Sequence, residues 1–258
     1  MGWFSIFTSN NLNLKKENLI FGIHPVLEAA RSGKPIDKLY VLKGSTHDKI
    51  EEVLKQIDTD AVSVNYVPIE KLDRLIRSNH QGIIASISPI TFKPLETVVE
   101  ELLESKDDPL FLILDQVSDV RNFGAILRTA ECTGVDAVII QKKGGAPVSG
   151  DTVKASAGAI FNIPICKVDH IKDAIFYLQG SGIKTIAATE KTEHTVYDVD
   201  LTGGLAIIMG SEGKGVSRSV LSLVDESAAL PLLGKINSLN VSVACGVFLY
   251  EVIRQRNL

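Results

Sequence analysis

The sequence has few of the residues that build disulfide frameworks and zinc sites. Its three cysteines, Cys132, Cys166 and Cys245, lie far apart and form no Cys-x-x-Cys pair. An odd number of separated cysteines argues against a disulfide scaffold or a zinc site and fits a cytoplasmic protein. Each cysteine stands among apolar or small residues, so we expect all three to be buried.

Long apolar stretches are also missing. Runs such as Leu110–Leu114 and Val241–Tyr250, the latter interrupted by Ser242 and Gly246, are far shorter than the roughly 20 residues of a transmembrane helix. The first residues lack the basic and apolar regions of a signal peptide, so we expect residues 1–13 to form a flexible extension.

The chain has no excess of positive charge. Its 31 acidic residues outnumber the 27 basic ones, and the net charge is −4. This balance argues against a protein that holds nucleic acid by bulk charge, but it permits a local basic site. The length of 258 residues corresponds to about 1.7 domains at roughly 150 residues each.

Short apolar strands alternate with amphipathic helices in two series. In residues 14–88 we predict strands at 19–21, 38–42, 62–66 and 83–87, and helices at 25–31, 47–56 and 69–77. Residues 89–108, with Pro89, Pro94 and many acidic residues, are predicted to form a linker carrying one helix.

Residues 109–258 form the second series. Its predicted strands are apolar on both faces, and they span residues 110–114, 137–140, 163–166, 184–188 and 205–209. Alternation of such strands with helices predicts an α/β domain with a mostly parallel sheet covered on both sides.

Three segments of this domain are rich in Gly, Asn and Ser. The first, Asp115–Ala130, leaves a strand and enters a helix that ends near Gly134; Asn122 can cap this helix, and Gly124 permits a close backbone approach. Ligands of open α/β sheets bind at such carboxyl ends of strands. An N-cap and a surface arginine at Arg128 would explain this segment alone equally well.

The second segment, Met209–Val216, holds three glycines directly after a strand. It matches neither the phosphate-loop pattern nor the dinucleotide-binding pattern, so neither ATP nor NAD is supported. The third segment, Leu230–Ala244, runs into a long apolar helix that Ser238 or Asn240 can cap. Each segment is ambiguous alone.

Together, in this order and spacing, the three segments resemble the signature motifs of the SpoU (TrmH-like) family of RNA ribose 2′-O-methyltransferases. The resemblance covers about residues 110–256, and residues 19–88 resemble the small ribosomal-protein-like RNA-binding domain of one branch, which methylates a guanosine ribose in large-subunit ribosomal RNA. It implies a SPOUT-type α/β domain with a deep C-terminal trefoil knot, a homodimer, and S-adenosylmethionine bound in the knot. The positions that match the cofactor site are Thr189, Gly210, Gly213, Leu230, Ser238, Leu239 and Asn240.

The family reaction is an in-line attack of a ribose 2′-oxygen on the sulfonium methyl group. The positions that match its polar catalytic residues are Asn122, Arg128, Glu212, Ser238 and Asn240. The pKa of a guanidinium group is above about 12, so the group stays protonated and is a poor base. We therefore interpret Arg128 as a clamp for the substrate phosphate that stabilises the developing alkoxide. Asn122 is expected to hold the ribose or the loop of Arg128. Glu212 is expected to orient Arg128, across the dimer interface or within one chain.

Basic residues near these motifs are candidates for RNA phosphate contacts. In the second domain they are Arg121, Arg128, Lys142, Lys143 and Lys154, and in the first domain His24 and Arg31. We predict no metal site. Two alternatives stay open, a transfer RNA as the substrate and a non-catalytic RNA-binding protein with this fold.

Overall fold

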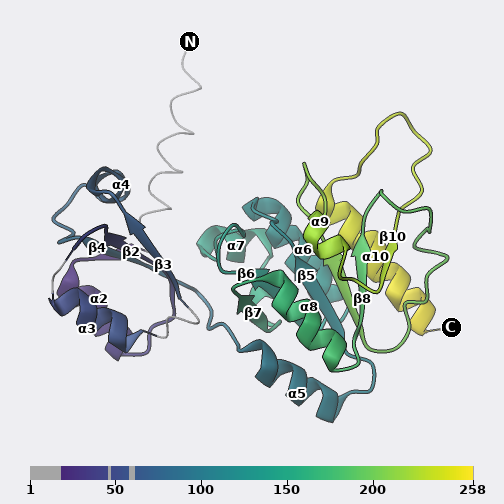
Figure 1. Ribbon diagram of the computed structural model, residues 1–258, viewed down its shortest axis with the longest axis horizontal. Coiled ribbons are helices and arrows are strands. Elements are labelled where there is room, and N and C mark those ends of the chain that lie inside the picture. The colour runs from purple at the N-terminus through teal and green to yellow at the C-terminus, as the bar shows by residue number, and fades with distance from the viewer. Residues whose placement is uncertain (1–18, 46–47, 58–61, 258) are drawn as a thin grey trace. The chain divides into compact units, whose positions relative to one another are not determined.

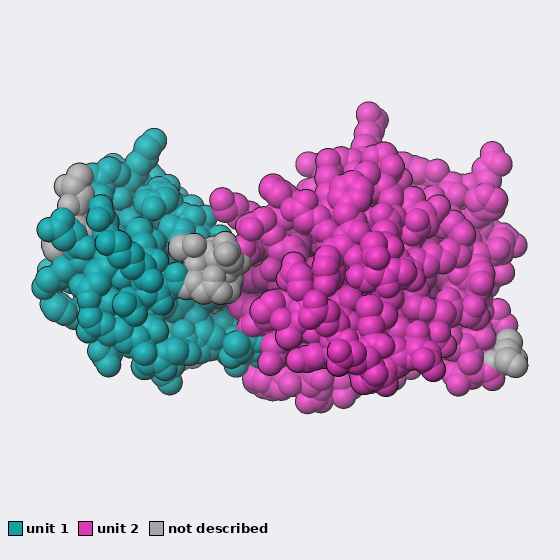
Figure 2. All heavy atoms as spheres, turned by 60° about the horizontal axis from the view of Figure 1, so that its bottom comes forward, with its two compact units in different colours: residues 1–91, 148–151 teal, residues 92–147, 152–258 magenta. Residues whose placement is uncertain are grey.

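The computed structural model describes residues 19–45, 48–57 and 62–257. The chain divides into two compact units, of which unit 1 comprises residues 1–91 with 148–151 and unit 2 comprises residues 92–147 with 152–258 (Figure 2). The predicted extension at residues 1–13 lies outside the described residues.

Unit 1 is an α/β unit built on a four-stranded sheet of order β1-β4-β2-β3. Only β2 and β3 pair in parallel among these strands; the other pairs are antiparallel. Helices α2 and α3 cover one face, and α4 packs on the other. The elements are β1 (Leu19–Phe21), α2 (Ile23–Arg31), β2 (Ile36–Leu42), α3 (Asp48–Gln56), β3 (Ser63–Val67), α4 (Ile69–Leu75) and β4 (Ile83–Ile87).

Unit 2 holds a six-stranded sheet of order β10-β8-β9-β5-β6-β7, and all of its strand pairs are parallel (Figure 1). The strands are β5 (Leu110–Leu114), β6 (Ala137–Gln141), β7 (Ile165–Val168), β8 (Lys184–Ala188), β9 (Leu205–Met209) and β10 (Glu226–Ala228). The helices are α5 (Leu95–Ser105), α6 (Val120–Cys132), the 3-10 turn η1 (Ala159–Phe161), α8 (Ile171–Gly180), α9 (Arg218–Leu221) and α10 (Val241–Arg256). Helix α7 (Gly150–Ala155) begins in the residues assigned to unit 1 and continues into unit 2.

Helices cover both faces of this sheet, as the doubly apolar strands predict. Phe111 and Ile113 of β5 point to the face that α5, α8 and α9 cover. Helices α6 and α10 pack against each other, and α10 also contacts β9. The apolar face of α5, with Leu95, Val98 and Val99, belongs to this core, so part of the segment 89–108 is built into unit 2.

Two expectations about local structure differ from the structure. Strand β10 is not among the predicted strands, because its three residues Glu226–Ala228 carry no apolar run and pair only with β8 at the sheet edge. Cys132 was expected to be buried and is exposed, because it ends α6 on the side away from the core. Cys166 and Cys245 are buried as expected.

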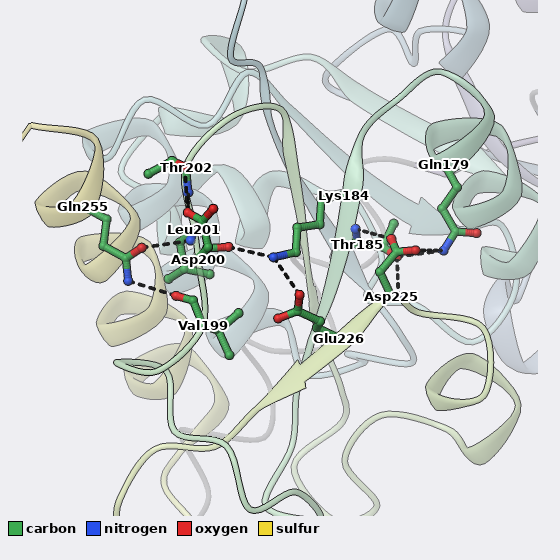
Figure 3. A network of polar contacts seen from close by, with 10 residues as sticks. All are labelled: Gln179, Lys184, Thr185, Val199, Asp200, Leu201, Thr202, Asp225, Glu226 and Gln255. Carbon is green, nitrogen blue, oxygen red and sulfur yellow. Dashed lines mark hydrogen bonds and ion pairs between the residues drawn. The ribbon is translucent and has the colours of Figure 1, made fainter.

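Polar contacts hold the segment between β8 and β9 against the rest of unit 2 (Figure 3). Gln255 of α10 donates to the carbonyl oxygen of Val199 at 3.1 Å and accepts from the amide of Leu201 at 2.8 Å. Lys184 at the start of β8 donates to the carbonyl oxygen of Asp200 at 3.0 Å and pairs with Glu226 of β10 at 2.9 Å. The chain that follows β8 is therefore held at its far end by Gln255 of α10 and by Lys184 of β8, which is itself paired with the edge strand β10.

Candidate functional site

The three motif segments meet at one edge of the unit 2 sheet. Strand β9 lies between β8 and β5, so the residues that follow these strands are neighbours. The amide of Asp115, directly after β5, donates to the carbonyl oxygen of Met209 at the end of β9, at 2.8 Å. This is the carboxyl edge of a parallel sheet, where α/β proteins bind their ligands.

Two aspartates outside the predicted site organise the first motif. Asp119 is the N-cap of α6, and its carboxylate accepts from the amides of Arg121 and Asn122 at 2.9 Å. Asn122 was predicted to cap this helix and does not, because it already lies in the first turn. Asp115 is buried and accepts from the amide of Ser217 at 2.8 Å, which ties the first motif to the second. Asp caps a helix as well as Asn does. Asp119, three residues before Asn122, was therefore the residue in the sequence that could have indicated the cap.

Gly124 provides the close approach predicted for it. A Cβ atom at this position would lie 2.3 Å from Cβ of Ala155 and 2.7 Å from its carbonyl carbon. Only glycine lets the end of α7 approach α6 this closely. The first motif is therefore packed against the segment that follows Ala155.

The second motif is a tight turn that closes on itself. The amide of Ser211 donates to the carbonyl oxygen of Gly215 at 3.1 Å, and the amide of Gly215 donates back at 2.8 Å. A Cβ atom on Gly210 would lie 2.0 Å from the carbonyl carbon of Gly215, whereas one on Gly213 would meet no atom within 4 Å. Gly210 is required by packing, and Gly213 leaves open space at the tip of the turn.

Asn240 joins all three motifs. Its Oδ1 accepts from the amides of Ser242 at 3.0 Å and Val243 at 3.3 Å and so caps α10, as predicted for one of two candidates. Its Nδ2 donates to Oδ1 of Asn122 at 3.0 Å and to the carboxylate of Glu212. The other candidate cap, Ser238, lies on the exposed approach to the helix. Three of the predicted catalytic residues thus form one hydrogen-bonded group.

A cavity of about 360 Å³ opens between the second and third motifs and the end of β8. Its size falls within the range of small-molecule sites. Of the predicted cofactor residues, Asn240 alone is absent from its described lining; the others line it, namely Thr189, Gly210, Gly213, Leu230, Ser238 and Leu239.

Charged and apolar residues beyond the predicted cofactor positions also line this cavity. Glu190 and Lys191 follow β8, and Lys214 lies in the glycine turn. Among the described residues none of these three has an ion pair. Met209 and Phe248 add apolar wall beside Leu230. Motif matching passes over Glu190 and Lys191 because they lie outside the three segments.

Arg128 lies on the exposed side of α6, two turns beyond its N-cap. Within the described residues its guanidinium has no hydrogen bond or ion pair and is free to hold an anion. Glu212, expected to orient Arg128, is instead bonded by Asn240 within the chain. A pairing of Glu212 with Arg128 across a dimer stays a prediction.

The predicted RNA contacts of unit 2 separate into exposed and buried residues. Arg121, Lys143 and Lys154 are exposed. Lys142 is buried, and its Nζ pairs with the carboxylate of Asp169 at 2.9 Å. This pairing leaves Lys143 as the accessible member of the two neighbouring lysines.

The two residues of unit 1 that were predicted to contact RNA, His24 and Arg31, differ in their surroundings. His24 is exposed in the first turn of α2, beside a turn whose Gln81 accepts from the amide of Ile23 at 2.9 Å. Arg31 ends α2 and pairs with Glu52 at 2.6 Å, with both side chains about half exposed. His24 and the Gln81 turn form one surface.

The two buried cysteines of unit 2 carry thiols with raised pKa values. Burial raises the pKa of the Cys245 thiol to about 12, and burial together with Glu96 raises that of Cys166 to about 12. In the described ranges, no group of three or more His, Cys, Asp or Glu side chains is arranged to hold a metal ion. No helix among the described residues is both long and apolar enough to cross a bilayer.

Comparison with known proteins supports the assignment of both units. The SpoU rRNA Methylase family matches residues 109–250, and the RNA 2′-O ribose methyltransferase substrate binding family matches residues 19–93. A 23S rRNA (guanosine-2′-O-)-methyltransferase of Vibrio cholerae is 37% identical over 92% of this chain and 97% of the relative. A TrmH family tRNA/rRNA methyltransferase of Staphylococcus aureus is 37% identical over 94% of this chain and 98% of the relative.

Solved structures share the fold. The SpoU methyltransferase AviRb from Streptomyces viridochromogenes aligns with a TM-score of 0.60 at 22% identity, covering 96% of this chain and 93% of that one. An AdoMet-bound rRNA methyltransferase from Sinorhizobium meliloti aligns with a TM-score of 0.60 at 22% identity, covering 97% and 95%. With its motif residues gathered at one sheet edge and both family matches in place, the chain belongs to the SpoU family of RNA ribose methyltransferases.

Proposed function

We propose that this enzyme transfers a methyl group from S-adenosylmethionine to the ribose 2′-hydroxyl of a guanosine in 23S ribosomal RNA. The observation that carries the proposal is the adjacency of the cavity to the Asn240–Asn122–Glu212 group, through Glu212, which belongs to both. A cofactor in the cavity would lie directly beside the polar residues that match the catalytic positions.

The cavity suits S-adenosylmethionine in its lining. Leu230, Leu239 and Phe248 offer apolar walls for an adenine ring, and the main-chain groups of the glycine turn offer hydrogen bonds. Glu190 and Lys191 supply opposite charges that suit the ammonium and carboxylate of an amino-acid tail. When bound, the cofactor supplies an activated methyl group.

The residues of this chain then position the RNA. Arg128, exposed and without a partner in the described structure, binds the phosphate of the target nucleotide and stabilises negative charge that develops on the 2′-oxygen. The Oδ1 atom of Asn122 is taken up by Asn240, so its Nδ2 is the group left to donate to a ribose oxygen.

The test is methyl transfer from tritiated S-adenosylmethionine to RNA isolated from a strain that lacks the gene. Label in 23S rRNA, mapped by ribose-methylation sequencing to one guanosine, is the expected result. Label in bulk transfer RNA would favour the alternative that the Staphylococcus aureus relative's name suggests. Absence of S-adenosylmethionine binding by calorimetry would overturn the catalytic proposal.

We also propose that the enzyme is a homodimer with α10 at its interface. The outer side of α10 exposes Val243, Val247 and Tyr250, which form an apolar groove with Tyr197. Exposed apolar surface of this kind marks a protein interface. Sedimentation should give a dimer for the unaltered chain and a monomer for Val247→Asp; a monomeric unaltered chain would refute the proposal.

A further inference from the structure

The segment from Ala155 to Asn162 is attached to α6 at both of its ends. At the first end, Gly124 makes room for Ala155, as described above. At the second, Nδ2 of Asn162 donates to the carboxylate of Glu131 at 3.1 Å. The segment therefore follows α6 from its first turns to its last turn.

Arg128 emerges between these two attachment points. Gly124, Arg128 and Glu131 are spaced four and three residues apart, which places them on one stripe of a helix. Since Gly124 and Glu131 both contact the segment, Arg128 projects beside it. The phosphate-binding arginine and the segment 155–162 thus share one surface.

This segment presents an aromatic ring to solvent. Phe161, in the 3-10 turn η1, is 59% exposed, whereas its neighbours Ala159 and Ile160 are buried. The turn is entered through two residues in left-handed conformation, Ala157 with φ 51° and Gly158 with φ 87°. A non-glycine residue in this region is strained, and such strain is concentrated at functional sites.

Two cations beside this segment have no ion-pair partner among the described residues. Lys154 lies one residue before Ala155, and Lys154 and Arg128 are both exposed and without an ion pair among the described residues. The acidic side chain on the stripe, Glu131, is engaged by Asn162. An exposed aromatic ring on a segment flanked by unpaired cations combines the two features by which proteins bind unpaired RNA bases, stacking and phosphate contacts.

We propose that Phe161 stacks on a base of the RNA substrate, next to the nucleotide whose phosphate Arg128 holds. The inference rests on the proposed function, because it takes RNA as the ligand of this surface. Stacking on one ring does not distinguish the bases strongly, so Phe161 would contribute affinity and orient the strand. The target base would be selected elsewhere.

The experiment measures binding of deproteinised 23S rRNA, from a strain lacking the gene, by filter retention. Phe161→Ala should bind about tenfold more weakly, the effect expected of one lost base–aromatic stack. Phe161→Trp should bind within about twofold of the unaltered chain, because it keeps the stacking surface. Phe176→Ala is the matched control, since Phe176 is 56% exposed on α8 of the same unit, remote in the fold from α6.

A second measurement asks whether the ring touches a base. An aryl azide in place of the phenyl ring at position 161 should crosslink to the labelled RNA on irradiation, and the same group at 176 should not. Equal RNA binding by Phe161→Ala and Phe176→Ala, or equal crosslinking at both positions, would overturn the inference. If the unaltered chain binds the RNA and transfers no methyl group, the proposed function fails while this comparison still decides the role of Phe161.

Discussion

Nδ2 of Asn240 donates to Oδ1 of Asn122 at 3.0 Å, while Oδ1 of Asn240 caps α10. The cap fixes the orientation of the Asn240 amide, because only its oxygen can accept from the helix amides. The nitrogen must then face Asn122 and Glu212. A structural contact at the start of one helix thereby determines which group Asn122 presents.

Asn240→Asp separates these two tasks. Aspartate caps a helix as well as asparagine, so the melting temperature should stay within a few degrees of that of the unaltered enzyme. The variant lacks both donated hydrogen bonds and sets a second carboxylate against Glu212, so methyl transfer should fall on the order of 10- to 100-fold. Asn240→Ala should lose the cap as well, at about 1 kcal/mol of stability. Unchanged activity in Asn240→Asp would show that the bridge to Asn122 has no part in the reaction.

Replacement of Arg128 should abolish methyl transfer without affecting the fold. Because the side chain is exposed and has no partner among the described residues, Arg128→Ala should leave the melting temperature and the affinity for S-adenosylmethionine unchanged. Arg128→Lys should rescue little activity, since an ammonium lacks the planar fork that binds phosphate bidentately. Arg218→Ala, an exposed arginine on α9, is the control that should stay fully active. A tritium assay in which Arg128→Ala retains activity would remove Arg128 from the site.

The sheet and the motif loops of unit 2 could be predicted from local sequence patterns alone. Doubly apolar runs such as Leu110–Leu114 and Leu205–Met209, alternating with helices, are typical of a covered parallel sheet, and they form β5 and β9 at the predicted bounds. The loops after such strands lie at the carboxyl edge, which brought Asn122, Glu212 and Asn240 together. These inferences depend on neighbours in sequence or on sheet geometry.

Contacts between residues that are distant in the sequence could not be predicted in this way. Lys142 is buried because Asp169, on the next strand's loop, neutralises it, and no local feature announces that pair. Glu190 lines the cavity only because β8 ends beside the glycine turn. The exposure of Phe161 depends on how η1 lies along α6. Each depends on a contact between elements that one sequence does not reveal.

Replacement by alanine should lower the stability of the enzyme at Gly210 and leave it unchanged at Gly213. Gly210→Ala forces a methyl group to within 2.0 Å of the Gly215 carbonyl carbon, so the turn must distort. We expect a loss of about 1–3 kcal/mol in unfolding free energy, typical of overpacking, and a loss of cofactor binding. Gly213→Ala meets no atom within 4 Å and should unfold like the unaltered enzyme. Denaturant unfolding of the two variants tests this, and equal stabilities would contradict the turn geometry.

Asp225 should make the stability of unit 2 depend on acid pH. Its carboxylate accepts from the amide of Thr185 at 2.8 Å, from the Thr185 hydroxyl at 2.7 Å and from Gln179 at 3.1 Å (Figure 3). Burial raises the pKa of this carboxyl group, but the hydrogen bonds from Thr185 and Gln179 outweigh it and hold the pKa below the ordinary value of 3.8.

A depressed carboxyl pKa stabilises the fold above the unfolded value near 3.8, and this stabilisation is lost as the pH falls through the lower folded value. The melting temperature should therefore fall as the pH drops below about 5 and continue to fall below 3.8, and part of this fall should be absent in Asp225→Asn, which is less stable at pH 7. Asp173→Asn, on the first turn of α8, is the matched control and should keep the full acid dependence. Melting curves for the three proteins across this pH range provide the test, and identical acid profiles would mean that the Thr185–Asp225 contact does not hold β8 to the chain before β10.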